Sequence, residues 1–328
     1  MLSITEVVFQ PPHSILPDMP ETDLEIVPAS HAARSEAFQW VFCDLDQADR
    51  TQFVARLPGG RAGGPVSCDG LFKARQGAEV VGAVWAQAMP GGVAIIWPPG
   101  VATDQPPATR LALIAAAVDF IEQQHVTMVL VLIDPTDEVQ TDPLKLAGFS
   151  HLADLLYLMS LDADFPTSIP SSQMRFRPIA EMPITEISDE YLQQLIEQTY
   201  TGTQDCPQLC GTRNLDDVLE GYRATGEYDP RRWWIVSEGD QDVGCLLMAD
   251  HPEAEQWELV YMGLVPAARG GGRGLQVVQY AQWQARLAGS PRLVLAVDAE
   301  NAPALAMYAA AGFYSWEKKR VFWRHFST

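Results

Sequence analysis

The second half of the chain alternates two hydrophobic patterns. Residues 189–200 (DEYLQQLIEQTY) place apolar side chains three or four positions apart, which predicts an amphipathic helix. Residues 291–301 (PRLVLAVDAEN) begin with a continuous apolar run, which is typical of a buried strand. The other predicted strands cover 174–180, 231–239, 242–250, 257–266 and 320–326, and the other predicted helices cover 215–226, 273–287 and 302–311.

The first half of the chain repeats this order of elements. Strands are predicted at 23–30, three times within 70–99, and at 126–134, with helices at 31–45, 47–57 and 108–124. The segment PLKLAGF at 143–149 matches MYAAAGF at 307–313 in place. The two halves therefore look like diverged copies of one α/β (α+β) unit.

A segment rich in proline and serine separates the halves. Residues 162–173 (DADFPTSIPSSQ) lack hydrophobic periodicity, which indicates a linker. We therefore expect one domain at 1–165, a linker at 166–173 and a second domain at 174–328.

Composition and charge narrow the class of protein. The chain has 328 residues, of which 47% are hydrophobic and 20% charged, enough for two globular domains. It contains no apolar run of about 18 residues and no secretion signal at its start, so a membrane partner is not expected. A net charge of −20 argues against nucleic acid. The acidity either serves solubility or attracts cationic small molecules or peptides.

The cysteines indicate a reducing compartment. There are five, an odd number, in a long chain without a secretion signal, so we expect free thiols and a cytoplasmic protein. Cys206 and Cys210 form a lone C-x3-C pair without a second cysteine pair or a histidine cluster, so no metal site is predicted.

A glycine-rich turn is the main candidate for chemistry. Residues 269–274 read RGGGRG, between a predicted strand and a predicted helix. Such a turn presents backbone N–H groups at a helix N-terminus, where anions bind. The sequence lacks the Gly-Lys-Ser/Thr end of a Walker loop and the G-x-G-x-x-G dinucleotide pattern. The structural alternative is simply a tight strand–helix turn.

The turn also belongs to a longer pattern. Arg269 to Gly274 reads R-x-x-G-x-G, and Asn301, Tyr308 and the Gly312–Phe313 pair follow at N-x6-Y-x3-G-F spacing. In both motifs the chain resembles the GCN5-related N-acetyltransferase (GNAT) family. The two similar halves resemble its tandem type, of which mycothiol synthase is an example. The resemblance implies two tandem GNAT-like domains, each a mixed, mostly antiparallel sheet flanked by helices.

The resemblance implies acetyl-CoA as the cofactor and assigns its binding residues. The turn would hold the CoA pyrophosphate, and a backbone amide of strand 257–266 would bind the thioester oxygen. The implied residues are Met262, Leu264, Arg269, Gly270, Gly271, Gly272, Arg273, Gly274 and Asn301. We also expect Asn301 to cap the helix that follows it.

Two residues are implied as catalytic. Glu258, in an otherwise apolar strand, matches a general base found in several family members, and desolvation there would raise its pKa. Tyr308 matches the acid that protonates the departing thiolate. The alternatives are a solvent-facing or ion-paired strand carboxylate and a packed helix tyrosine. His251 and His325 are expected to be structural.

The resemblance also implies an acceptor pocket covered by the first two helices of the second domain and the loop between them, here residues 199–214. Asp205 could meet a cationic amine and Cys206 could line the pocket, unless this is an ordinary surface loop. The first domain lacks the signature, because Pro106 and Pro107 stand where amide donors are needed. We therefore expect a degenerate first domain that buttresses the second and walls the acceptor site.

The predicted function is N-acetyltransfer from acetyl-CoA to a primary amine, by direct attack in a ternary complex. The acceptor stays open between small amines, aminoglycoside-like cations, peptide N-termini and thiol-bearing metabolite precursors. The alternative function is a non-catalytic acyl-CoA binder that acts as a regulator or sensor. A purely structural protein is the third interpretation.

Overall fold

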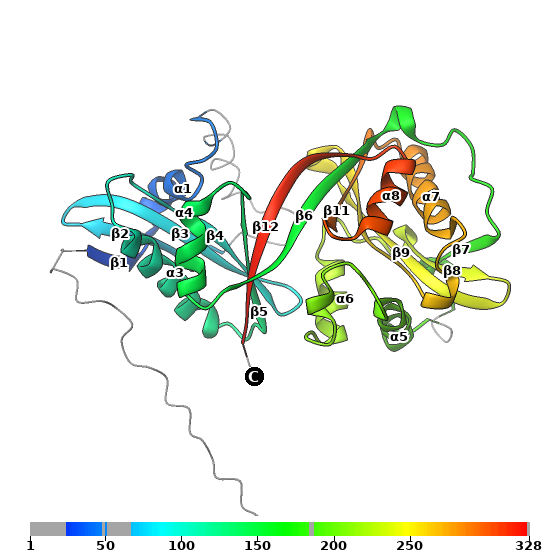
Figure 1. Cartoon of the computed structure of the whole chain (residues 1–328), viewed down its shortest axis with the longest axis horizontal. Helices are drawn as coiled ribbons and strands as arrows, with labels where there is room; N and C mark the ends of the chain where they lie inside the picture. Colours follow the sequence, from blue (N-terminus) through cyan, green and yellow to red (C-terminus); the bar gives the residue numbers. More distant parts are fainter. Residues whose placement is uncertain (1–23, 48–49, 51–66, 184–186, 327–328) are drawn as a thin grey trace, which may run out of the picture.

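The strands of the described residues form one mixed sheet. The structure, a computed structural model, describes residues 24–47, 50, 67–183 and 187–326. Twelve strands lie in the order β1-β2-β3-β4-β5-β12-β6-β11-β10-β9-β8-β7. Figure 1 shows two lobes joined by the long strands β6 and β12. The helix predicted at 47–57 lies outside the described residues, apart from Gln47 and Arg50.

The N-terminal lobe follows the predicted order of elements. Its elements are β1 (Leu24–Pro28), α1 (Arg34–Val41), β2 (Leu71–Gln76), β3 (Glu79–Met89), β4 (Val93–Val101), α3 (Pro107–Glu122), β5 (Met128–Ile133) and α4 (Glu138–Leu146). Leu113, Ile114 and Ile121 of α3 are fully buried against one face of the sheet. Phe38 of α1 packs against Trp85 on the opposite face.

The C-terminal lobe also follows the prediction. Its elements are β7 (Met174–Pro178), α5 (Asp189–Tyr200), α6 (Leu215–Arg223), β8 (Trp233–Glu238), β9 (Gln241–His251), β10 (Gln256–Leu264), α7 (Arg273–Leu287), β11 (Arg292–Asp298) and α8 (Ala302–Ala310). Helices α7 and α8 cover one face of the sheet and α5 and α6 the other (Figure 1). The site is built between these two helix pairs.

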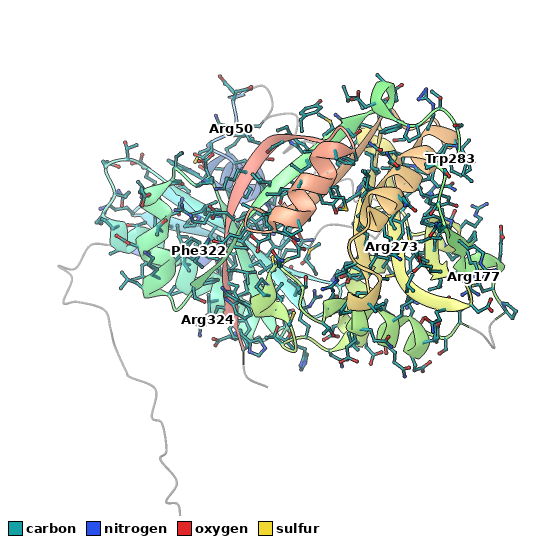
Figure 2. The ribbon with its side chains drawn as sticks, turned by 45° about the vertical axis from the view of Figure 1, so that its right-hand side comes forward. Arg50, Arg177, Arg273, Trp283, Phe322 and Arg324 are labelled. Carbon is teal, nitrogen blue, oxygen red and sulfur yellow. The ribbon has the colours of Figure 1, made fainter. Side chains whose placement is uncertain are left out.

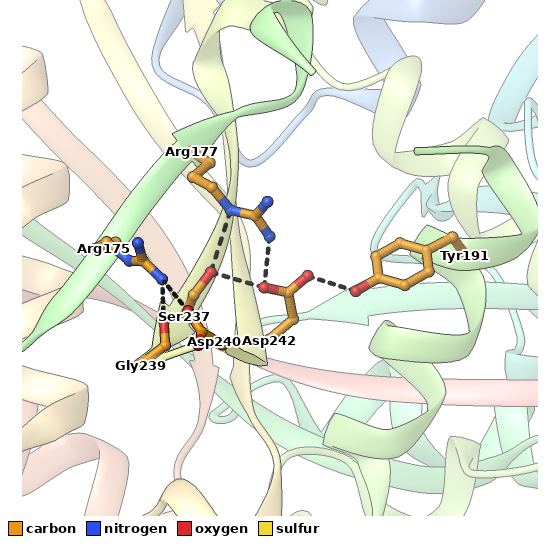
Figure 3. Close-up of polar contacts among 7 residues, drawn as sticks. All are labelled: Arg175, Arg177, Tyr191, Ser237, Gly239, Asp240 and Asp242. Atoms are coloured by element: carbon orange, nitrogen blue, oxygen red, sulfur yellow. Dashed lines mark hydrogen bonds and ion pairs between the residues drawn. The ribbon is translucent and has the colours of Figure 1, made fainter. Parts of the chain in front are cut away.

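A polar network fastens α5 to the sheet edge (Figure 3). Asp242 of β9 accepts hydrogen bonds from Tyr191 of α5 at 2.5 Å, from Ser237 of β8 at 2.7 Å and from Arg177 of β7 at 2.5 Å. Burial acts to raise the pKa of Asp242, but these three donors outweigh it and lower the pKa. The network thereby fixes the start of α5, whose other end reaches the site.

The two lobes exchange their last strands. β6 (Ser150–Leu161) follows the N-terminal lobe in the chain but pairs with β11 from Leu161↔Arg292 to Leu155↔Asp298. β12 (Tyr314–His325) pairs with β6 and then with β5 of the N-terminal lobe. Phe322 of β12 is buried in the core of that lobe (Figure 2). Residues 165–173 form neither helix nor strand, and the domain boundaries themselves stay a prediction.

We expect the fragment 174–328 to be unstable on its own. It lacks β5 and β6, so β12 would lose both neighbouring strands and β11 would keep only its short pairing with β10; unpaired edges invite aggregation. Size-exclusion chromatography and thermal unfolding should show aggregated or unfolded protein, and co-expression with residues 1–165 should restore a soluble complex. A monomeric fragment that unfolds cooperatively would contradict this expectation.

Candidate active site

Two parallel strands separate at the centre of the C-terminal lobe. β10 and β11 pair only at Trp257↔Leu293 and Glu258↔Val294. Beyond Glu258, β10 keeps its pairing with β9 up to Leu264, so its other edge is left without a strand partner. An unpaired edge of this kind offers backbone groups to an extended ligand.

A cavity of about 1000 Å³ opens at this separation. Its wall combines the end of α5, the α5–α6 loop, α6, β10, β11, the glycine turn and α8. Ten of the predicted site residues line it: Asp205, Cys206, Met262, Leu264, Arg269, Gly270, Gly272, Gly274, Asn301 and Tyr308. Gly271, Arg273 and Glu258 are not among its lining residues. The structure thus brings most of the predicted residues together at one cavity.

The glycine turn has the backbone that its sequence predicts. Gly270, Gly271 and Gly272 have φ angles of +78°, +59° and +76°, which favour glycine over residues with a Cβ. Gly272 is the N-cap of α7. The N–H groups of Gly270, Gly271, Gly272 and Gly274 donate to no acceptor among the described residues. The turn is therefore a row of free donors beside a cavity, at the positive end of a helix dipole.

The two arginines of the turn have structural partners. Arg269 donates to the carbonyl oxygens of Leu264, Gly202 and Thr199 at 3.0, 3.2 and 2.7 Å, which ties the end of α5 to the end of β10. Arg273 bonds Glu238 at 2.9 Å and lies at the start of α7 (Figure 2). Their side chains hold the turn in place, whereas the amides of its glycines are left without an acceptor among the described residues.

Tyr308 projects from α8 to the cavity wall. The residue is only 6% exposed, and its hydroxyl forms no hydrogen bond with any described residue. Burial raises the pKa of Tyr308, and the carboxylate of Asp205 adds to the rise. The phenol therefore stays protonated at neutral pH with its proton free to be donated.

Glu258 lies at the point where the strands separate. It is the last residue of β10 paired with β11, and Leu259, the next residue, lines the cavity. Its carboxylate accepts a hydrogen bond from His251 Nε2 at 2.7 Å, so the residue is paired rather than isolated in an apolar strand. His251, expected to be structural, is the partner of this carboxylate.

The acceptor loop is clamped to β11 by two aspartates. Asp205 accepts from the Asp298 amide at 2.9 Å, and Asp298 accepts from the Cys206 amide at 3.1 Å. Asp205 is open to the cavity, yet the protein atoms around it raise the pKa of its carboxyl by desolvation. Asn301 accepts from the Ala304 amide at 3.3 Å, which confirms the predicted helix cap.

The thiol of Cys206 is held protonated. Burial, followed by the charges of Asp205 and Asp298, raises its pKa to about 12. A thiol in that state is a poor nucleophile. All five cysteines are present as thiols rather than in disulfides, as expected.

Sequence reasoning missed a tyrosine cluster in the wall. Tyr200 and Tyr222 share a hydrogen bond of 2.9 Å, and Tyr222 stacks on Tyr261 with ring centroids 5.3 Å apart. The hydroxyl of Tyr261 bonds Thr199 at 2.5 Å. The signal available in the sequence was their position: Tyr200 lies in the loop assigned to the acceptor, Tyr222 in the helix after that loop, and Tyr261 in the strand assigned to the donor.

The comparisons place this site in a known family. A model of the acetyltransferase (GNAT) family matches residues 194–313, which include the glycine turn, Glu258 and Tyr308. The chain carries a GNAT domain. This confirms the resemblance read from the two motifs.

Relatives in sequence match over part of their length. A mycothiol acetyltransferase of Streptomyces bingchenggensis is 31% identical over 107 residues, which are 33% of this chain and 34% of that protein. A mycothiol acetyltransferase of Jonesia denitrificans is 37% identical over 83 residues, 25% and 26% of the two chains. The matched segments thus span about a third of these relatives or less.

Solved structures match the GNAT fold over nearly the whole chain. A GCN5-related N-acetyltransferase from Sphaerobacter thermophilus has a TM-score of 0.60 at 15% identity, covering 94% of this chain and 96% of that one. A tandem GNAT protein from the clavulanic acid biosynthesis pathway has a TM-score of 0.51 at 14% identity, covering 93% and 99%. These matches confirm the predicted fold class of two tandem GNAT-like units. No helix among the described residues is long and apolar enough to cross a bilayer.

Proposed function

We propose that the chain transfers an acetyl group from acetyl-CoA to the primary amine of a small-molecule or peptide acceptor, in its GNAT domain. The observation that carries the proposal is the set of unbonded glycine amides at Gly270, Gly271, Gly272 and Gly274, which meets the free edge of β10 and Tyr308 at one cavity. The acetyltransferase names of the sequence relatives support it.

Binding of the donor uses the backbone. The amides of the glycine turn would hold the pyrophosphate with the dipole of α7 behind them. The free edge of β10 would pair with the extended pantetheine arm, and the amide of Met262 or Leu264 would bind the thioester oxygen. Side chains at the turn, in contrast, are committed to Glu238 and to carbonyl oxygens.

Acetyl-CoA supplies an activated thioester carbonyl when bound, and two side chains move the protons. Glu258 lies just outside the cavity, so we propose that it takes the proton of the amine through a water molecule. His251 holds its carboxylate in place. Tyr308 donates its proton to the leaving sulfur. Direct attack by the amine fits the protonated state of Cys206, which disfavours an acyl-cysteine route.

The N-terminal lobe has a supporting role in this proposal. Pro107 is the first residue of α3 and Pro106 its N-cap, so neither of these positions offers an N–H group there. Gly91, in the turn between β3 and β4, packs on α6, since a Cβ there would lie 2.4 Å from the Asp217 carbonyl oxygen. The lobe thus lies against the helix that carries part of the cavity wall.

We expect acetyl-CoA to stabilise the full-length protein. At 100 times its dissociation constant it should raise the free energy of unfolding by about 2.7 kcal/mol, measured by thermal unfolding at several ligand concentrations. Thiol release with a panel of amines then tests turnover. Stabilisation without thiol release from any amine would favour the acyl-CoA binder, and no stabilisation would overturn both functions.

A further inference from the structure

Of the two arginines that line the cavity, Arg213 has neither an ion pair nor a set of close carbonyl partners among the described residues. Arg213, between the acceptor loop and α6, lines the cavity and makes one long hydrogen bond, from Nη2 to the carbonyl oxygen of Gly91 at 3.4 Å. Its Nε is buried without a partner. No acidic residue in the described part of the chain forms an ion pair with it. A partly buried charge without compensation is costly, and here it occurs in a chain of net charge −20.

The other arginine at the cavity, Arg269, has a structural role and can be compared with Arg213. Arg269 uses Nε and both terminal nitrogens on the carbonyl oxygens of Leu264, Gly202 and Thr199. Arg213 has the same five donors and uses one of them. Arg269 uses three of its five N–H groups, so among the described cavity residues Arg213 is the cation with the most donors to spare.

Arg213 lies at the acceptor side of the cavity. The same part of the wall includes Leu215, Val218 and Tyr222 of α6 and Tyr200 of α5, and these helices lie on the face of the sheet opposite α7 and α8. The free amides of the glycine turn lie at the start of α7. A donor held at the turn would leave the α5–α6 side of the cavity to the acceptor.

We propose that Arg213 binds an anionic group, carboxylate or phosphate, carried by the acceptor. The acceptor is then a small amine with an anion at the end remote from its reacting nitrogen. This inference rests on the proposed acetyltransfer and specifies its substrate class. Guanidinium binds both anions through paired N–H groups, and the tyrosine rings that line the same cavity offer apolar contact to the body of the molecule.

Matched amine pairs test the proposal with the full-length protein. One arm compares the common L-amino acids with their carboxamides, and the other compares glucosamine 6-phosphate with glucosamine. We expect higher kcat/KM for the anionic member of the preferred pair, and the arm in which this occurs identifies the anion. Arg213→Gln should lower that kcat/KM by about 10- to 100-fold, mainly through KM, and leave the neutral member and the acetyl-CoA dissociation constant unchanged. Arg213→Lys should restore part of the loss.

The control variant is Arg223→Gln, at the end of α6, where the arginine pairs with Asp189 and does not line the cavity. It should leave the preference for the anionic member intact. Equal kcat/KM for both members of each pair in the wild type, or an equal loss of kcat/KM for both in Arg213→Gln, would overturn the anion site. The proposed function would still stand if acetyl-CoA stabilises the protein and neutral amines are turned over. If no amine is turned over, equilibrium binding of the same amine pairs tests the anion site. Binding of neither member, or equal binding of both, would overturn it. Failure of acetyl-CoA to stabilise the chain would overturn the proposed function as a separate result.

Discussion

Tyr308→Phe is expected to lower kcat by about 10²–10⁴-fold, the usual contribution of a positioned general acid, while acetyl-CoA affinity stays unchanged. The substitution removes one oxygen from a side chain that is otherwise packed in the core of the lobe. Because that hydroxyl bonds no described residue, its loss leaves no buried partner unsatisfied. Steady-state thiol release and a binding isotherm for acetyl-CoA measure the two quantities separately.

Tyr280→Phe is the matched control for this prediction. Tyr280 is a buried tyrosine of α7, 8% exposed, whose hydroxyl accepts a hydrogen bond from Gln284 and does not line the cavity. It should affect stability modestly and kcat little. If Tyr308→Phe kept wild-type kcat, Tyr308 would be a packing residue and the acid would have to be sought elsewhere in the cavity.

The pH dependence of the wild type follows from the same residue. Burial raises the pKa of Tyr308 above the usual value of about 10. The acid form is therefore present throughout the neutral and mildly alkaline range. An alkaline loss of kcat below about pH 10 would have to come from a group other than Tyr308.

Local signals explain why the elements around the site could be predicted. Helix α5 was predicted at its observed bounds, and the Ser188 side chain before it accepts a hydrogen bond from the Tyr191 amide. Asn214 and Asn301 cap α6 and α8 in the same way. The turn before α7 requires glycine at several left-handed positions in succession. Such features depend on neighbouring residues, so a sequence carries them directly.

Contacts between distant residues could not be read in this way. Strand β6 was not predicted, and its place between β11 and β12 depends on pairing with residues from the far end of the chain. The partners of Arg269 are backbone carbonyls of α5, the loop after it and β10, which no motif encodes. Likewise, nothing in the strand pattern indicated that Glu258 pairs with His251.

Gly272→Val is expected to abolish measurable binding of acetyl-CoA. The φ of Gly272 is +76°, and a Cβ added there would have no other atom within 4 Å, so the new side chain would project into open space at the turn rather than into protein. It would stand where we place the pyrophosphate. Loss of two charge-assisted hydrogen bonds would cost about 3–6 kcal/mol, or about 10²–10⁴-fold in affinity. Isothermal titration and the ligand-induced thermal shift measure the loss.

Backbone strain alone must be separated from this effect, and the other end of α7 provides the means. Gly289 has a φ of +73°, no atom within 4 Å of an added Cβ and no place in the cavity wall. Gly289→Val therefore carries the same backbone strain, about 1–2 kcal/mol, but does not obstruct the glycine turn. Both variants should unfold at similarly reduced temperatures, and acetyl-CoA should stabilise Gly289→Val alone. Equal stabilisation of both would mean that the amides of the glycine turn do not hold the diphosphate. The donor site would then lie elsewhere, because a valine at Gly272 cannot share that space with a phosphate.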